Sequence, residues 1–143
     1  MGINKIQVER ISPTAKLPTR GHANDAGLDF YSNEETLLLQ GENKAIGTGI
    51  KIAIPDGYVA LVWDKGGIAR AGIHTMAGVI DAGYRGEVVI EIINLSKDSY
   101  KIKPGQKIAQ ILIQEVSLPE IEETKIDDQT TRGAGKHGST GLY

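Results

Sequence analysis

The sequence predicts an all-β protein, and three observations support this fold class. Short runs rich in β-branched residues recur at spacings of roughly ten residues, each bounded by turn-forming residues. Eighteen glycines, about twice the average usage, separate many of these runs. Helical periodicity is nowhere sustained beyond a turn or two. The chain has 143 residues, 40% of them hydrophobic, which suffices for one core, so we expect a single β-sandwich or barrel.

The first expected strands are short and irregular. Ile3–Arg10 alternates weakly and is expected to form the first strand. Ser12–Asn24, with two prolines and a glycine, is expected to be irregular. Ala26–Ser32 (AGLDFYS) is the next short strand and carries Asp29 between apolar neighbours. Thr36–Leu39 is a further apolar segment.

The middle of the chain has the clearest alternation. Isoleucines at every second position of Ile50–Ile54 indicate a strand that ends at the turn of residues 55–57 (PDG). Tyr58–Trp63 then continues as a strand. Lys65–Gly72 (KGGIARAG) is glycine-rich and is expected to hold a short helical turn at most.

A β-hairpin is expected where the apolar runs Val79–Ile80 and Val88–Ile93 are joined by a connection of small residues. The tip of this hairpin carries Asp81, Tyr84 and Arg85 within five residues. A carboxylate, an aromatic ring and a guanidinium so close together fit either a polar hairpin tip or a functional site.

The last strands lead into a segment of different composition. Tyr100–Ile102 and the strongly apolar Ile108–Val116 flank a turn at residues 103–106 (KPGQ). From Ser117 onward the chain is first acidic and then glycine-rich. We therefore expect a β-rich core at residues 1–116 and a flexible arm at 117–143, which is either a disordered terminus or a cover for a phosphate chain.

Several function classes are excluded by composition. A net charge of −2 argues against nucleic-acid and membrane partners, and the absence of cysteine excludes thiolate chemistry. The three histidines lack metal-ligand spacing, and no nucleophile elbow is present. The spacing from Gly133 to Gly138 approaches a P-loop, but Ser139 stands where that motif needs lysine. A hard-metal, phosphate-directed site remains. The start lacks a signal peptide, so a soluble, cytoplasmic protein is expected.

Five segments in order resemble the motifs of the trimeric dUTPase family. Together they cover nearly the whole chain, and the second one departs from the usual pattern. They are Ala26–Ser32 (AGLDFYS), Asp64–Ala69 (DKGGIA), Gly78–Val88 (GVIDAGYRGEV), Pro104–Gln110 (PGQKIAQ) and Arg132–Gly141 (RGAGKHGSTG). Each motif alone is weak, but five in order with fitting intervals are a specific signal.

The resemblance implies a distorted jelly-roll β subunit that forms a homotrimer with active sites at the subunit boundaries. The implied reaction is Mg²⁺-dependent hydrolysis of dUTP to dUMP and pyrophosphate. This reaction lowers dUTP and supplies dUMP for dTMP synthesis. The C-terminal arm is implied to close over the site of a neighbouring subunit.

The resemblance also assigns roles around the nucleoside. Backbone groups of Gly78, Val79 and Ile80, with the return strand near Val89, would pair with the uracil edge. Tyr84 would pack on the deoxyribose, where a 2′-hydroxyl would clash. Asp81 would orient or deprotonate the water that attacks the α-phosphorus. Arg85 is expected to brace the hairpin or a subunit contact.

The triphosphate and its metal are assigned to the remaining motifs. Asp29 and Gln110 would act on Mg²⁺ indirectly, through its bound water, while the triphosphate holds the ion. His137 would cover the base. The residues assigned to the phosphates are Lys65, Gly66, Gly67, Gln110, Arg132, Gly138, Ser139 and Thr140.

Three positions depart from the family's usual residues. Lys65 replaces arginine and keeps the charge without the bidentate fork. Gly66 replaces a serine whose hydroxyl lies near the scissile phosphate, so slow turnover is expected. His137 replaces phenylalanine and offers less apolar area for stacking.

Two alternatives stay open at this point. Relatives with the same fold deaminate dCTP, which needs a general acid/base facing the pyrimidine, and Glu87 and Glu91 are carboxylates near the hairpin. The glycine at position 66 also fits a nucleotide-binding, regulatory trimer that has lost catalysis.

Overall fold

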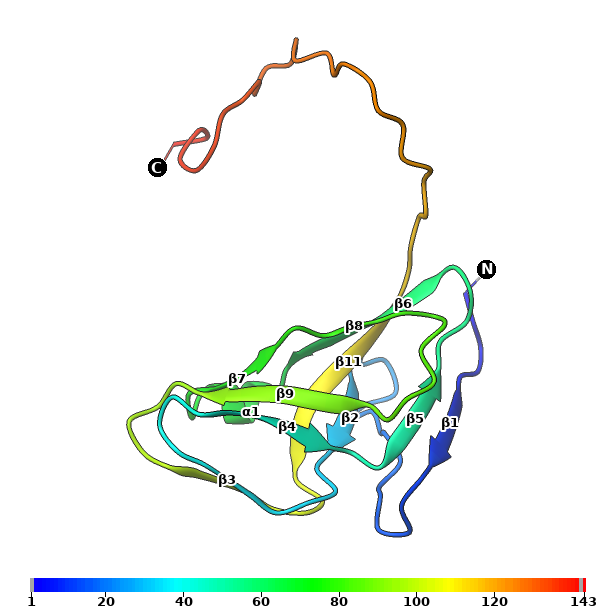
Figure 1. The fold of residues 1–143 in the computed structure, drawn as a ribbon, viewed down its shortest axis with the longest axis vertical. Coiled ribbons are helices and arrows are strands. Elements are labelled where there is room, and N and C mark those ends of the chain that lie inside the picture. The colour runs from blue at the N-terminus through cyan, green and yellow to red at the C-terminus, as the bar shows by residue number, and fades with distance from the viewer. Residues whose placement is uncertain (1, 142) are drawn as a thin grey trace.

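The computed structural model describes residues 2–141 and residue 143, and strands dominate it (Figure 1). The elements in chain order are β1 (Gln7–Arg10), β2 (Leu28–Tyr31), β3 (Thr36–Leu38), β4 (Asn43–Gly47), β5 (Ile50–Ala53), β6 (Tyr58–Asp64), α1 (Gly66–Ala69), β7 (Ile73–Met76), β8 (Val79–Ile80), β9 (Val89–Asn94), β10 (Tyr100–Ile102) and β11 (Lys107–Glu115). The predicted all-β class is confirmed.

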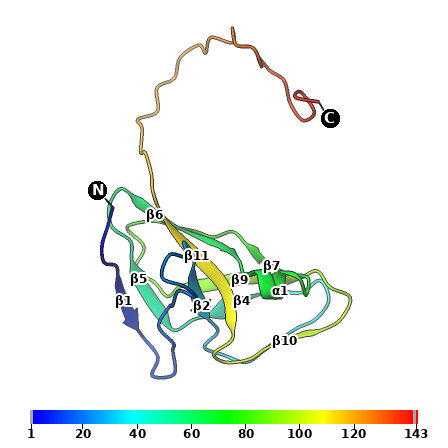
Figure 2. The same cartoon turned by 180° about the vertical axis from the view of Figure 1, so that it is seen from behind.

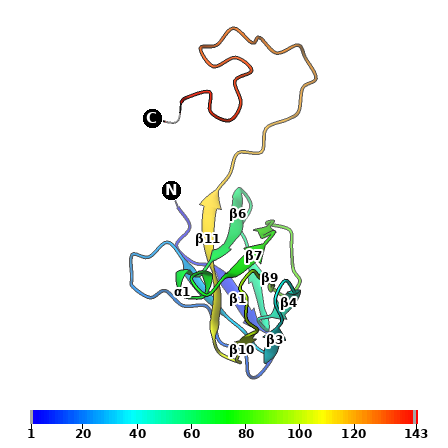
Figure 3. The same ribbon diagram turned by 90° about the vertical axis from the view of Figure 1, so that its left-hand side faces the viewer.

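The strands form four antiparallel sheets around one core. The largest has the order β2-β11-β6-β8, the second has the order β4-β9-β7, and the pairs β1-β5 and β10-β3 complete the body. Figure 3 shows β11 on one side of the body and β4 and β9 on the other. Phe30 and Ile111 from the first sheet and Ile46, Ile90 and Ile92 from the second belong to one buried cluster. The chain is a jelly-roll β structure.

The expected hairpin between Val79–Ile80 and Val88–Ile93 is wrong in its pairing. β8 pairs with β6, through Ile80 opposite Ala60, whereas β9 pairs with β4 and β7. The chain therefore changes sheets between β7 and β8 and returns through residues 81–88. The sequence pattern identified both apolar runs, but alternation does not specify which strand a run will pair with.

The change of sheet depends on two residues with positive φ. Ala77 has φ 57° and Gly78 has φ 125°. The carbonyl of Gly78 accepts a hydrogen bond from the Val62 amide at 2.8 Å, which anchors the turn to β6. A Cβ atom at Gly78 would lie 2.7 Å from the Val62 Cβ, so only glycine allows this close approach.

Two strands, β4 and β7, were not predicted from the sequence. β4 contains Asn43, Lys44 and Gly47 and has no β-branched alternation. β7 alternates buried Ile73 and Thr75 with exposed residues, but it is only four residues long and follows a glycine-rich segment. The first strand begins at Gln7 rather than at Ile3. Most other expected strands agree within a few residues, and the short helical turn after Lys65 is present as α1.

The C-terminal segment lies away from the body. β11 ends at Glu115 and leads directly into the arm, as the view from behind shows (Figure 2). Residues 117–141 are exposed and contain neither helix nor strand. Their hydrogen bonds are local, for example from the Ser139 amide to the Lys136 carbonyl at 3.0 Å. Across the described part of the chain, no helix is long and apolar enough to cross a membrane.

Candidate functional site

A pocket of about 220 Å³ lies between β8 and β9, and we call it the β8–β9 pocket. It collects six of the residues that the sequence assigned to the nucleoside and the catalytic water, although β8 and β9 belong to different sheets. Its lining residues are Val62, Met76, Ala77, Gly78, Val79, Ile80, Asp81, Tyr84, Glu87, Val89, Ile90 and Glu91. The change of sheet at Gly78 opens this pocket, because it separates the two strands that a hairpin would have paired.

The loop that forms one wall of this pocket is held by its own hydrogen bonds. The Tyr84 hydroxyl donates to the Glu87 carbonyl at 2.8 Å, and the Tyr84 amide donates to the Asp81 carbonyl at 3.1 Å. Arg85 Nη1 donates to the carbonyls of Ala82 and Tyr84, at 2.6 and 2.8 Å. Arg85 therefore braces the loop, and the Tyr84 ring has a fixed place at the pocket wall.

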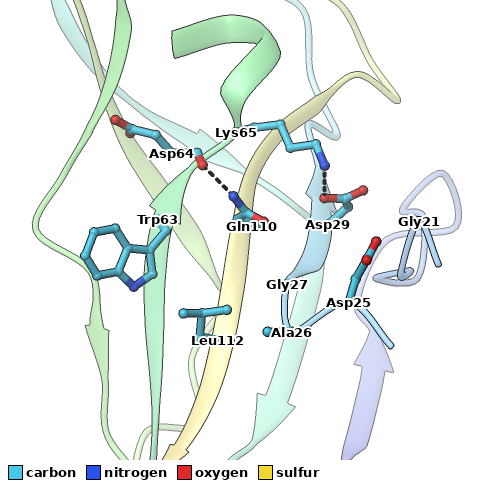
Figure 4. A pocket seen from close by; sticks show the side chains of 10 residues that line it. All are labelled: Gly21, Asp25, Ala26, Gly27, Asp29, Trp63, Asp64, Lys65, Gln110 and Leu112. Carbon is cyan, nitrogen blue, oxygen red and sulfur yellow. Dashed lines mark hydrogen bonds and ion pairs between the residues drawn. The ribbon is translucent and has the colours of Figure 1, made fainter. Parts of the chain in front are cut away.

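A second pocket, of about 440 Å³, lies over β2, β11 and β6, and we call it the Asp29 pocket (Figure 4). It collects Asp29, Lys65 and Gln110 from three of the five motifs. Its lining residues are Gly21, Asp25, Ala26, Gly27, Asp29, Trp63, Asp64, Lys65, Gln110 and Leu112. Figure 4 shows the Lys65 side chain reaching across the pocket to Asp29.

Asp29 is a buried anion between two cations. Its side chain is 2% exposed, with Lys65 Nζ 2.7 Å from Oδ1 and Lys107 Nζ 2.8 Å from Oδ2. Burial raises the pKa of Asp29, but the charges of Lys107 and Lys65, together with the hydrogen bond from Lys65, outweigh it and leave the pKa below its ordinary value. Lys107 contributes as an ion pair, because its geometry at Oδ2 does not form a hydrogen bond. Asp29 is therefore ionised at neutral pH.

The lowered pKa of Asp29 predicts an acid-sensitive contribution to stability. A group whose pKa is lower in the folded state stabilises the protein above its unfolded pKa, here 3.8, and loses this effect as the pH falls through the folded pKa. The difference in free energy of unfolding between wild type and Asp29→Asn should therefore shrink below about pH 4. Urea unfolding of both proteins between about pH 6 and pH 3 measures it. A difference independent of pH would contradict the ion pairing.

Gln110 is fixed by a close packing of backbone and side chain. Its Nε2 donates to the Asp64 carbonyl at 2.8 Å, as drawn in Figure 4. A Cβ atom at Gly27 would overlap the Gln110 amide, so glycine at position 27 makes room for it. The Asp64 carboxylate in turn accepts hydrogen bonds from the Thr75 amide and hydroxyl, at 2.6 and 2.7 Å. These contacts tie the end of β6 to β7 beside the pocket.

The segment after Lys65 is open. Gly66 and Gly67 are exposed at the start of α1, and a Cβ atom at either position would meet no atom within 4 Å. Residues 65–67 therefore contribute one positive charge, that of Lys65, followed by two glycines. A larger residue has room at both glycines.

The structure does not bring the arm residues to either pocket within this one chain. Arg132, His137, Gly138, Ser139 and Thr140 are exposed in the arm that arches away from the body (Figure 1). Arg132 Nε donates to the Gly135 carbonyl at 3.1 Å, a local contact. The lining residues of the two pockets, as far as the chain is described, do not overlap.

Two features near the site were missed by sequence reasoning. Lys107 contacts Asp29, although it stands inside the fourth motif and received no role. Asp64 precedes Lys65 directly and supports Gln110. The position of Lys107 within PGQKIAQ was a signal that pointed to it. The described residues contain no group of three or more His, Cys, Asp or Glu side chains that could hold a metal ion.

Comparison with known proteins gives one consistent result. The dUTPase family model matches residues 13–141. The deoxyuridine 5'-triphosphate nucleotidohydrolase of Nocardia farcinica is 39% identical over 143 residues, covering 97% of this chain and 87% of that protein. The same-named protein of Mycolicibacterium vanbaalenii is 42% identical over 95% of this chain and 94% of its own length. The structure of Staphylococcus bacteriophage 80alpha dUTPase with dUpNHpp superposes with a TM-score of 0.91 at 30% identity, covering 98% and 100% of the two chains.

Proposed function

Because the chain belongs to the dUTPase family, we propose that it hydrolyses dUTP to dUMP and pyrophosphate at a site built from its two pockets and its arm. One observation carries this proposal: Asp81, Tyr84 and the backbone of residues 78–80 line a single small pocket. This arrangement joins a carboxylate, an aromatic wall and the outer backbone edge of β8, a strand that, among the described residues, pairs only with β6, and it supports a nucleoside site here.

The β8–β9 pocket would take the deoxyuridine. Backbone groups of Gly78, Val79 and Ile80, with those near Val89, would pair with the uracil edge. A base edge held closely by this backbone would leave no room for a 5-methyl group, and cytosine would leave buried polar groups unpaired. The Tyr84 ring, held by its hydroxyl on the Glu87 carbonyl, would pack on the deoxyribose.

Asp81 would serve the attacking water. The water oxygen forms a bond to the α-phosphorus, the bond from that phosphorus to the oxygen of the β-phosphate breaks, and pyrophosphate leaves. Asp81 accepts the proton that the water loses. Asp81 lines the pocket next to Ile80, so its carboxylate borders the space proposed for the nucleotide.

Magnesium fits this chain as an ion held by the substrate. The described residues offer no carboxylate cage, whereas Asp29 is an ionised carboxylate on a pocket wall. Asp29 and Gln110 would contact the water molecules of a Mg²⁺ ion bound by the triphosphate. The ion would offset the negative charge of the phosphates. One relative, the phage phi11 dUTPase, coordinates a structural Mg(II) ion.

The phosphates would lie among cations and glycines from separate segments. Lys65, with the amides of Gly66 and Gly67, would hold them from the body, and Gln110 would shape this side of the site. Arg132 would contact the terminal phosphates from the arm, and His137 would stack on the base. Gly138, Ser139 and Thr140 would complete the cover.

A homotrimer would bring these parts together. The two pockets share none of their described lining residues, and the arm of one chain reaches neither of them. A third pocket, of about 330 Å³, shares Trp63 and Asp64 with the Asp29 pocket and Gly78 with the β8–β9 pocket, so the body of one chain places the two pockets side by side. The arm is the part that one chain does not bring to them, which supports a site completed by the arm of a neighbouring copy. The arm would then close over a neighbouring subunit's site.

Mixing two inactive variants should restore activity if the sites are shared. We expect full-length Asp81→Asn and Arg132→Gln each to be strongly impaired alone. After subunit exchange, some sites combine Asp81 from one copy with Arg132 from another, so pyrophosphate release should rise well above the mean of the separate proteins. Activity that stays at that mean after exchange, verified by mass spectrometry of tagged copies, would place both residues in one chain's own site.

Pyrophosphate release with Mg²⁺ tests the function itself. We expect release from dUTP and little or none from dTTP or UTP, because the proposed pocket would exclude the 5-methyl group and the Tyr84 ring would exclude the 2′-hydroxyl. Ammonia release from dCTP tests the deaminase alternative. In that alternative Glu87 is the less available carboxylate, because its Oε1 already accepts a hydrogen bond from the Gly49 amide at 2.7 Å. A trimer that binds dUTP without cleaving it would be the regulatory alternative.

A further inference from the structure

Strand β11 contains a bulge that changes the direction of Lys107. Lys107 lies opposite Tyr31, whereas Ala109 lies opposite Phe30 and Gln110 opposite Asp29, so the register shifts by one residue at position 108. In a regular strand, residues 107 and 110 would face opposite sides of the sheet. The extra residue brings both onto the face that carries Asp29.

The burial pattern of β11 agrees with this geometry. Ile108 and Ala109 are both fully buried, although neighbouring residues of a regular strand point to opposite faces. Leu28, Asp29 and Phe30 of β2 are also buried in succession, so the register shift, and not burial alone, identifies the bulge. The bulge therefore places Lys107 on the same face of the sheet as Asp29, which lies opposite Gln110. From this position the Lys107 ammonium reaches the Asp29 carboxylate.

The two lysines divide the Asp29 carboxylate between them. Lys65 Nζ lies 2.7 Å from Oδ1, and Lys107 Nζ lies 2.8 Å from Oδ2. Asp29 is buried, while the side chains of Lys65 and Lys107 are 32% and 43% exposed. Lys65 lines the Asp29 pocket, so its remaining N–H groups are the ones available to a ligand there.

We propose that Lys107 is a positioning residue for phosphate binding, which acts by sharing Asp29 and so keeps Lys65 available. The proposal rests on the function proposed above, in which Lys65 binds the triphosphate. A buried carboxylate with one counter-ion would hold that lysine on both of its oxygens. The phosphates would then compete with Asp29 for Lys65.

Lys107 also supports the bound state. When Lys65 turns toward the phosphates, Asp29 keeps Lys107 as its counter-ion. Without Lys107, the same movement would leave a buried charge unpaired, which is costly in a protein interior. Both effects predict the same consequence, a weaker nucleotide complex after loss of the Lys107 charge.

Replacing Lys107 by Gln tests this inference. The dissociation constant of dUpNHpp should rise about tenfold, the size of one lost charge-assisted hydrogen bond, and KM for dUTP should rise with it. The kcat value should stay within about twofold, because Lys107 does not contact the reacting atoms. Lys107→Arg should restore binding. Lys101→Gln is the matched control, since it removes an exposed lysine that pairs with Glu35 at 3.0 Å away from both pockets.

The Asp29→Asn background separates this mechanism from a direct phosphate contact. Without the carboxylate there is nothing to share, so adding Lys107→Gln should change dUpNHpp affinity less than twofold. An undiminished tenfold loss in that background would mean that Lys107 touches the nucleotide itself and would overturn the proposal, as would unchanged affinity of the single variant. Thermal unfolding establishes that each variant is folded.

Lysine acylation gives a readout that needs neither nucleotide nor the Asp29 variant. In Lys107→Gln, Lys65 should be acylated more slowly than in wild type, because the carboxylate holds its ammonium more tightly, while Lys101 should react at an unchanged rate. Mass spectrometry of digested protein measures both sites. Equal rates at Lys65 would overturn the sharing of Asp29. Failure of wild type to cleave dUTP would instead overturn the proposed function and leave the acylation result to decide the sharing.

Discussion

Asp81→Asn should lower kcat for dUTP by about 10²- to 10⁴-fold, the contribution typical of a general base. The amide keeps the size of the side chain and cannot accept a proton from water. Binding should survive, because the residues proposed to hold the nucleoside are the backbone of Gly78–Ile80 and the ring of Tyr84. Titration with dUpNHpp and a pyrophosphate-release assay separate the two effects.

A second carboxylate in the same pocket provides the control for Asp81. Glu91 lines the β8–β9 pocket and is exposed on β9. Glu91→Gln removes an equal charge from the same pocket, so it should leave kcat within a few-fold of wild type. A near-normal kcat in Asp81→Asn would exclude Asp81 as the base, and an equal loss in both variants would point to the net charge of the pocket.

Gly66→Ser should raise kcat by about ten- to a hundredfold. The family places a serine hydroxyl at this position, and one hydrogen bond to a charged group contributes roughly 1.5–3 kcal/mol. The structure has room for the change, because a Cβ atom at Gly66 meets no atom within 4 Å. Single-turnover kinetics at saturating dUTP measure the chemical step directly.

Two variants separate the hydroxyl from the backbone in this test. Gly66→Ala adds the Cβ atom and removes the same backbone freedom, but it has no hydroxyl. Gly67→Ser places the hydroxyl one residue further along α1, where the space is equally open. Neither should reproduce the gain. A rise in all three variants would show that a stiffer segment, and not the hydrogen bond, is responsible, and no rise in Gly66→Ser would make the hydroxyl dispensable here.

The fold class was accessible from the sequence because it depends on local patterns, whereas the grouping of the candidate site residues came from the resemblance of five motifs to one family. Short β-branched runs with turn residues predicted the strands, and motif order predicted that Asp81, Tyr84 and Val89 serve one function. The structure places these three residues around one pocket. Asp29, Lys65 and Gln110 come from distant motifs and also meet in one pocket. The roles of both groups stay predictions.

The pairing of strands was not accessible in the same way. The run at Val79–Ile80 could pair either with the run that follows it, now β9, or with β6. Its pairing with β6 depends on the positive φ of Ala77 and Gly78. The contact of Lys107 with Asp29 depends on a register shift of one residue. Both are properties of the assembled backbone, and neither leaves a periodic pattern in the sequence.

The turn at Gly78 also affects which amino-acid substitutions the protein can accept during evolution. Under the proposed function, the groups that select the base belong to the main chain, and the main chain is the same whatever side chains accompany it. Val79, 66% exposed, could be replaced many times without altering the donors and acceptors beside it. Selectivity would thus be shielded from most point mutations and concentrated in one glycine, whose replacement would alter the backbone of the whole pocket.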